Sequence, residues 1–157
     1  MAQIVIIMGS KADITHSEAI KKELEKFNIN VIMRIASAHK LPLKVLEIIK
    51  EYEKDTQAFI TVAGKSNALS GLVDFHTVKP VIACPPYSEK FCGSDLFSSL
   101  RMPKGVAPMV VLEPEQAALA AAKIIAMSDE NVRLKLSRYR IKLKEEIEKA
   151  DQDLLNG

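Results

Sequence analysis

The sequence predicts an α/β fold built on a parallel sheet. Short apolar segments rich in Ile and Val alternate along the chain with longer segments whose apolar residues recur at helical spacing. Strands and helices that alternate in this way form βαβ units with parallel strands and right-handed crossovers. The chain has 157 residues, of which 48% are hydrophobic and 27% charged, which suits one domain with a buried core.

The predicted strands are short runs typical of a sheet that is covered on both faces. The first reads QIVIIM and ends at a glycine. In chain order the predicted strands are Gln3–Met8, Asn30–Ala36, Ala58–Ala63, Val81–Cys84 and Met109–Leu112.

Helices are predicted between these strands and after the last one, because apolar residues there return every three or four positions. The segment 85–108 is rich in loop-forming residues and contains only a short amphipathic stretch. The predicted helices are Asp13–Phe27, Leu43–Tyr52, Asn67–Phe75 and Glu115–Met127, with the short stretch at Asp95–Leu100.

The last segment, Asp129–Leu155, carries seven basic and seven acidic residues and follows a body that already looks complete. Its apolar residues form one stripe on a long helix: Val132, Leu136, Tyr139, Leu143, Ile147, Ala150 and Leu154. Such a helix packs either on its own domain or, as an arm, on a neighbouring subunit. We therefore expect an α/β domain at 1–128 and a C-terminal helical arm of the same domain at 129–157.

Charge and composition exclude several classes of protein. The 22 Lys and Arg against 20 Asp and Glu leave a net charge of +2, which argues against a nucleic-acid partner. No apolar run approaches the roughly 20 residues that span a bilayer, and the N-terminus lacks the pattern of a signal peptide. Cys84 and Cys92 are too few for a disulfide scaffold or a zinc pattern. We expect a cytoplasmic protein without a metal site.

Polar residues follow the first predicted strand, where ligands of open parallel sheets bind. Ser10 and Asp13 have the spacing of a capping box, which fixes the start of the next helix. A glycine turn at a helix N-terminus, here Gly9, also presents backbone N–H groups to a phosphate. Capping of the helix and binding of a phosphate can therefore occur at the same turn.

The second junction, Ser37–Lys40, places His39 directly after a strand. Histidine exchanges protons near neutral pH, so His39 is a candidate general acid–base, although a lone loop histidine is more often exposed and idle. His16 and His76 are weaker candidates for this role, because neither follows a predicted strand end.

The third junction, Gly64–Asn67, reads Gly-Lys-Ser-Asn and is similar to the end of a P-loop. Phe59 stands where that motif needs glycine, and no G-x-G-x-x-G occurs, so triphosphate and dinucleotide sites are unsupported. Cys84, before two prolines, is expected to be a buried small hydrophobe. By themselves, these residues indicate a site for a phosphate-bearing small molecule with one histidine.

Three of these motifs, in register over residues 3 to about 127, resemble the aminoimidazole ribonucleotide (AIR) carboxylase family of purine biosynthesis. They are Met-Gly-Ser-x-x-Asp at 8–13, Ser-Ala-His-Lys at 37–40 and Leu-Arg-Met-Pro at 100–103. One branch of the family, the mutase, has Ser-Ala-His-Arg and a histidine-bearing Gly/Ala loop after the third strand. The branch that uses carbon dioxide directly has Ser-Ala-His-Lys, Gly-Lys-Ser-Asn and Cys-Pro-Pro, as this chain does, and also a histidine at the position of His16. Thr15 and Leu41 depart locally from the pattern.

The resemblance implies a three-layer, flavodoxin-like αβα sandwich and a homo-octamer with active sites between subunits. It implies carboxylation of AIR by carbon dioxide without a cofactor, with His39 as the catalytic residue. By the same resemblance, phosphate and ribose would be bound by Gly9, Ser10, Asp13, Ser37, Ala38 and Lys40. The pocket for carbon dioxide and the base would comprise Gly64, Lys65, Ser66, Asn67 and Gly71. The alternatives are the mutase that rearranges the nitrogen-carboxylated isomer and a non-catalytic module that binds a phosphorylated ligand.

Overall fold

A computed structural model describes residues 2–157 and contains one five-stranded sheet in which every pair of neighbouring strands is parallel. The strand order is β2-β1-β3-β4-β5, so the chain runs first to one edge and then across to the other. This confirms the predicted parallel sheet. The strands are β1 (Gln3–Met8), β2 (Asn30–Ile35), β3 (Ala58–Val62), β4 (Val81–Ala83) and β5 (Met109–Val110).

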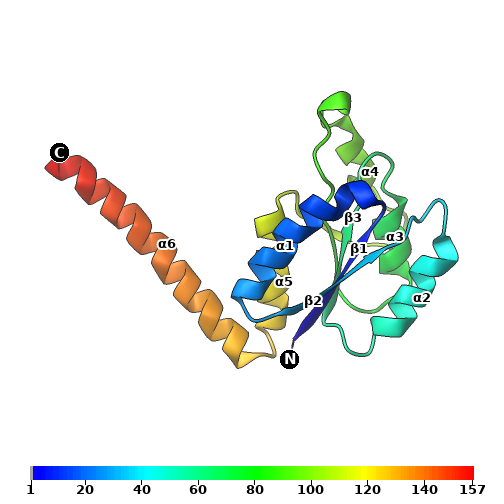
Figure 1. The fold of residues 1–157 in the computed structure, drawn as a ribbon, viewed down its shortest axis with the longest axis horizontal. Coiled ribbons are helices and arrows are strands. Elements are labelled where there is room, and N and C mark those ends of the chain that lie inside the picture. The colour runs from blue at the N-terminus through cyan, green and yellow to red at the C-terminus, as the bar shows by residue number, and fades with distance from the viewer. Residues whose placement is uncertain (1) are drawn as a thin grey trace.

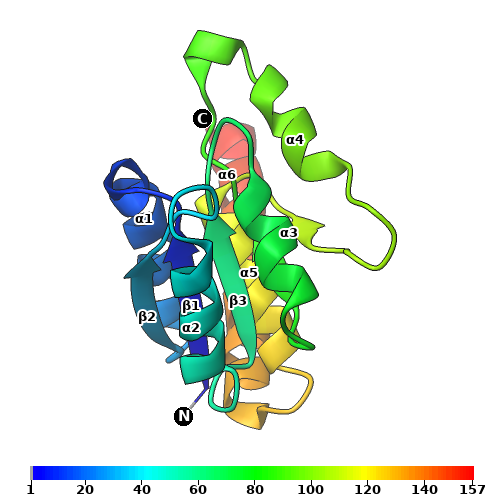
Figure 2. The same cartoon turned by 90° about the vertical axis from the view of Figure 1, so that its right-hand side faces the viewer.

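Helices cover both faces of the sheet and complete a three-layer sandwich. In Figure 1, α1 and α5 lie to the left of the sheet, whereas α2 and α3 lie to the right. Figure 2 views the same molecule from the side of α2 and α3. The helices are α1 (Ile14–Lys26), α2 (Pro42–Tyr52), α3 (Ala68–Phe75), α4 (Phe97–Leu100), α5 (Pro114–Ile125) and α6 (Glu130–Asn156).

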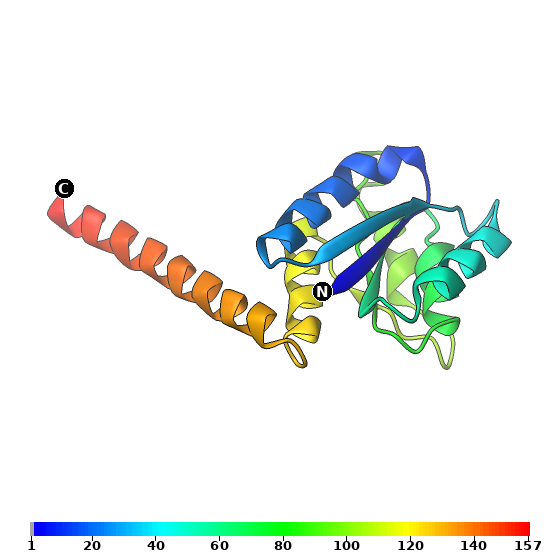
Figure 3. The ribbon, with the colours of Figure 1, turned by 60° about the horizontal axis from the view of Figure 1, so that its bottom comes forward.

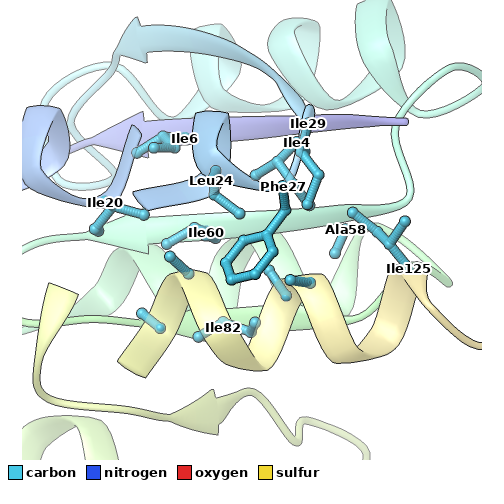
Figure 4. Close-up of a cluster of buried hydrophobic side chains, with 14 of the residues drawn as sticks. Ile4, Ile6, Ile20, Leu24, Phe27, Ile29, Ala58, Ile60, Ile82 and Ile125 are labelled. Atoms are coloured by element: carbon cyan, nitrogen blue, oxygen red, sulfur yellow. The ribbon is translucent and has the colours of Figure 1, made fainter. Parts of the chain in front are cut away.

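Successive residues of β1 point into two different cores. Ile4 and Ile6 belong to the cluster beneath α1 and α5, part of which is drawn in Figure 4. Val5 and Ile7 belong to the cluster beneath α2 and α3. All four side chains are fully buried, which explains why the strand is apolar at every position from Ile4 to Met8 instead of at every second one.

The segment between β4 and α5 departs most from the sequence prediction. The strand predicted at Met109–Leu112 ends at Val110, and the preceding loop contains two 3-10 turns, Glu89–Phe91 and Ser94–Leu96, in addition to α4. The sheet hydrogen bonding nevertheless continues one residue further, because Val111 N donates to Ala83 O. The difference therefore lies at the end of the strand and leaves the topology unchanged.

The long helix α6 leaves the body of the domain (Figures 1 and 3). Asp129 caps its N-terminus, since its Oδ1 accepts a hydrogen bond from Val132 N at 3.1 Å. Val132 and Leu136 are buried, and Tyr139 stacks edge-to-face on Phe27 with ring centroids 5.7 Å apart. Every residue from 140 to 157 is exposed. The first half of the predicted stripe thus packs on its own domain.

Candidate active site

The loop after β1 is a short, tightly hydrogen-bonded turn. Ser10 donates from its backbone N and its Oγ to Asp13 Oδ2, at 2.8 and 3.0 Å, and Ser10 Oγ accepts from Ala12 N. This is the capping box that the spacing predicts. Gly9 allows close packing of two loops, because a Cβ there would stand 3.3 Å from the Cβ of Ala63 and the neighbouring loop would have to shift slightly.

The loop after β2 presents His39 to solvent. Lys40 N and Leu41 N both donate to Ser37 O, which closes a turn around the histidine. The His39 side chain is exposed and makes no hydrogen bond within residues 2–157. It is therefore free to approach a bound molecule.

The loop after β3 is fixed from outside by a segment that lies about 30 residues further along the chain. Lys65 N donates to Asp95 Oδ2 at 3.0 Å, and Asn67 N donates to Ser98 Oγ at 3.0 Å. The Asn67 side chain is buried: its Nδ2 donates to Ser99 Oγ, and its Oδ1 caps α3 by accepting from Ser70 N. Asn67 thus holds the loop in place.

These loops enclose one cavity of about 480 Å³ at the carboxyl edge of the sheet. Nine of the site residues named from the sequence line it: Gly9, Ser10, Asp13, Ser37, Ala38, His39, Gly64, Lys65 and Ser66. Three do not. Lys40 is exposed and follows the lining residue His39, the Asn67 side chain is buried behind the loop, and Gly71 faces Met102, whose Sδ would lie 3.2 Å from a Cβ at that position.

The segment after β4 supplies lining residues that sequence reasoning did not single out. Pro86, Tyr87, Ser88 and Asp95 complete the wall of the cavity. The Cys-Pro-Pro turn marks the start of this segment in the sequence, and the amphipathic stretch predicted at Asp95–Leu100 begins at Asp95, but neither pattern indicates that Tyr87 or Asp95 lines the site. The irregular loop between β4 and α4 brings both residues to the cavity.

A second cavity of about 510 Å³ adjoins the first on the side of α1 and α5. Its lining includes His16 and also residues that line the first cavity, among them Gly64, Lys65 and Asp95. Burial lowers the pKa of His16 despite the opposing influence of Asp13 and other nearby carboxylates. Cys84, which precedes the two prolines, is buried, as predicted from the sequence.

Residues 2–157 contain neither a cluster of metal ligands nor a membrane-spanning helix. No group of three or more His, Cys, Asp or Glu side chains is placed to hold a metal ion. No helix in this part of the chain is long and apolar enough to cross a membrane.

Comparison with known protein families identifies the family of this chain. The model of the AIR carboxylase family matches residues 3–146, which include every loop that lines the cavity. The chain belongs to the AIR carboxylase family. The resemblance seen in three short motifs therefore extends over nearly the whole domain and into α6.

Individual AIR carboxylase relatives agree with this assignment. A phosphoribosylaminoimidazole carboxylase of Archaeoglobus fulgidus is 63% identical over 150 residues, covering 96% of this chain and 83% of the relative. One from Treponema denticola is 46% identical over 138 residues, covering 87% of each chain. The crystal structure of Treponema denticola PurE superposes with a TM-score of 0.95 at 43% identity, covering 98% of this chain and 99% of that one. Both the predicted family and the predicted flavodoxin-like architecture are confirmed.

Proposed function

We propose that the protein catalyses the reversible carboxylation of AIR by carbon dioxide, giving carboxyaminoimidazole ribonucleotide for purine biosynthesis. The observation that carries the proposal is the meeting of His39, Ser10 and the Gly64–Ser66 loop in one cavity of a chain that belongs to this family. The relatives reported above are named as carboxylases, which favours this reaction over the mutase reaction.

The nucleotide is proposed to bind at the ends of β1 and β2. Ser10 and Ser37 line the cavity and offer hydroxyl groups to the 5′-phosphate, next to backbone N–H groups at the start of a helix. Asp13 uses one carboxylate oxygen on Ser10, and its second oxygen can accept from a ribose hydroxyl. Lys40, exposed and next to His39 in the chain, adds a positive charge that attracts the phosphate.

His39 is proposed to carry the proton. The amino group of AIR makes carbon 4 of the imidazole electron-rich, so this carbon attacks the carbon of carbon dioxide. A carbon–carbon bond forms, and one C=O bond opens to give the carboxylate. His39 then takes the proton from carbon 4, and the ring recovers its aromaticity. In the reverse direction, His39 returns the proton to carbon 4 before carbon dioxide leaves.

Carbon dioxide is proposed to bind beside the Gly64–Ser66 loop. This loop offers backbone groups and little apolar bulk, and the ligand is small and uncharged, so shape and a few donors must hold it. We expect weak saturation by carbon dioxide and tight binding of AIR.

We also propose that the protein works in the cytoplasm as a homo-oligomer, with an octamer as the expected assembly. Both cysteines are free thiols, which suits a reducing compartment. The exposed half of α6 carries apolar residues, including Ile147 and Leu154, that no part of residues 2–157 covers. A neighbouring subunit would cover them.

The test offers the enzyme two substrates in separate assays that follow the ultraviolet spectrum. The first contains AIR and dissolved carbon dioxide, and the second contains the nitrogen-carboxylated isomer under conditions that trap its spontaneous breakdown products. Rapid formation of carboxyaminoimidazole ribonucleotide in the first assay alone supports the proposal. Efficient use of the isomer with negligible use of carbon dioxide identifies a mutase, and no turnover of either identifies a binding module.

A further inference from the structure

The wall of the active-site cavity formed by the Gly64–Asn67 loop is held by a second segment, Asp95–Ser98. Asp95 Oδ2 accepts from Lys65 N at 3.0 Å, while Ser98 Oγ donates to Lys65 O at 2.9 Å. Ser98 Oγ also accepts from Asn67 N. Both backbone polar groups of Lys65 are thus bound by the Asp95–Ser98 segment.

Lys65 has an unfavourable backbone conformation. Its φ of 58° lies in the left-handed region, which costs free energy for a residue with a Cβ unless the surroundings enforce it. A hydrogen bond from a backbone N–H to a carboxylate is charge-assisted and roughly twice as strong as one between neutral groups. The Asp95 carboxylate is therefore well suited to offset the strain at Lys65.

Asp95 also lies next to the proposed site of carboxylation, so that a small shift of its carboxylate would move the wall of the cavity. Asp95 and Lys65 both line the first cavity, which contains His39, and the second, which contains His16. The oxygen that binds Lys65 would be 3.9 Å from a Cβ at Gly64, so the carboxylate lies directly against the loop. The groups assigned to the phosphate, Ser10 and Ser37, belong to other loops.

We propose that Asp95 is a positioning residue for the carboxylation step: its carboxylate holds Lys65 in the left-handed conformation and so fixes the Gly64–Asn67 loop beside carbon 4 of the substrate. The inference rests on the proposed function. It assigns a role to a residue that need not touch the substrate, and it separates two parts of the site. Loss of Asp95 should slow the chemical step and leave nucleotide binding intact.

The experiment compares Asp95→Ala with Asp95→Asn and with a matched control. Asp74 provides the control, because its Oδ2 also accepts a backbone N–H from a distant loop (Ala107 N at 2.7 Å) but lines neither cavity. Misplacing reacting groups by about 1 Å can cost about 100-fold in rate, so we expect Asp95→Ala to lower kcat by about 10- to 100-fold with the KM for AIR unchanged. Asp95→Asn keeps an acceptor and should recover most of kcat, while Asp74→Ala should leave both constants unchanged.

A double-mutant cycle with Lys65→Gly tests the backbone explanation. Glycine adopts the left-handed conformation without strain, so Asp95→Ala should reduce kcat much less in the Lys65→Gly background. An equal loss in both backgrounds, an Asp95→Asn variant as slow as Asp95→Ala, or an Asp95→Ala variant as fast as Asp74→Ala would each overturn the proposal.

Amide hydrogen exchange gives a readout that needs no activity. Exchange at Lys65 N should accelerate in Asp95→Ala and stay unchanged in Asp74→Ala. If the unmodified enzyme does not carboxylate AIR, the proposed function fails, and the exchange result still decides whether Asp95 holds this loop. Unchanged exchange at Lys65 N in Asp95→Ala would show that Asp95 does not hold this loop.

Discussion

Nε2 of His16 lies 3.3 Å from Sγ of Cys84, joining the first turn of α1 to the end of β4. Burial lowers the pKa of His16, and burial together with Glu113 and Glu115 raises the pKa of Cys84 to about 12. Both shifts favour the uncharged forms, so a neutral imidazole meets a protonated thiol at neutral pH. Cys84 consequently acts as a structural residue, and its neighbour His16 lines the second cavity as a neutral group.

The two cysteines should therefore differ sharply in reactivity. The thiolate is the reactive form, and Cys84 is both buried and held protonated, whereas Cys92 is exposed. Iodoacetamide at mildly alkaline pH should label Cys92 in the folded protein and leave Cys84 unmodified, as read by mass spectrometry of the peptides. Denaturant should make both react. Labelling of Cys84 at a rate near that of Cys92 in the folded protein would contradict the assignment.

His16 should make the stability of the fold sensitive to pH. Its pKa in the folded protein is below the ordinary value of 6.5, so below that pH the unfolded chain binds more protons than the folded one. The free energy of unfolding should fall as the pH drops through and below 6.5. Above pH 6.5 the neutral His16 contributes its full share to stability.

The measurement is urea denaturation over the range from about pH 8 to about pH 5, in which histidine changes charge. Other groups titrate as well, so the difference between the unmodified protein and a His16→Asn variant isolates the contribution of this residue. The variant should lose less stability on acidification than the unmodified protein. A His76→Asn variant, altered at an exposed histidine, should behave like the unmodified protein. Parallel pH profiles for the unmodified protein and His16→Asn would refute the prediction.

The parts of the site that the sequence predicted are those encoded by neighbouring residues. The capping box needs only Ser10 and Asp13, three positions apart, and His39 is marked by the strand that precedes it. Because strand ends of a parallel sheet meet at one edge, the sequence alone assigns the three junctions after β1, β2 and β3 to a single site.

The parts that the sequence did not predict depend on long-range packing. The amphipathic stretch predicted at Asp95–Leu100 indicates a short helix but not its partner, because the loop that brings Asp95 to Lys65 consists of irregular turns. The family resemblance assigns Asn67 and Gly71 to the pocket together with Gly64, but neither lines the cavity. Whether a residue near a helix start faces a ligand or the protein depends on the helix direction, and here Asn67 bonds to Ser99 while Gly71 faces Met102.

Replacing His39 should remove catalysis without unfolding the protein. The side chain is exposed and makes no hydrogen bond within residues 2–157, so His39→Asn should leave the thermal unfolding temperature unchanged. Loss of a general acid–base group typically costs about 100- to 10,000-fold in rate, and the decarboxylation assay should show a drop of this size. His76→Asn serves again as the control. Near-normal turnover by a folded His39→Asn enzyme would exclude His39 as the proton-transfer residue.

The exposed half of α6 should determine the assembly state. In this half Leu143, Ile147, Ala150 and Leu154 are spaced alternately four and three residues apart, which places them along one seam of the helix. Ile147 and Leu154 are 72% and 84% exposed, and an uncovered row of this kind is unusual on a monomer.

Ile147→Glu combined with Leu154→Glu places two charges on this seam. Because residues 140–157 are exposed throughout, the double variant should keep the circular dichroism spectrum of the folded domain. Its mass by light scattering should fall well below that of the unmodified protein, since burying two charges against a neighbouring subunit is costly. Glu148→Lys combined with Lys149→Glu changes the same turn of helix without touching the seam, and it should keep the full mass. If the seam variant also keeps the full mass, α6 does not hold the subunits together and the interface must lie on the body of the domain.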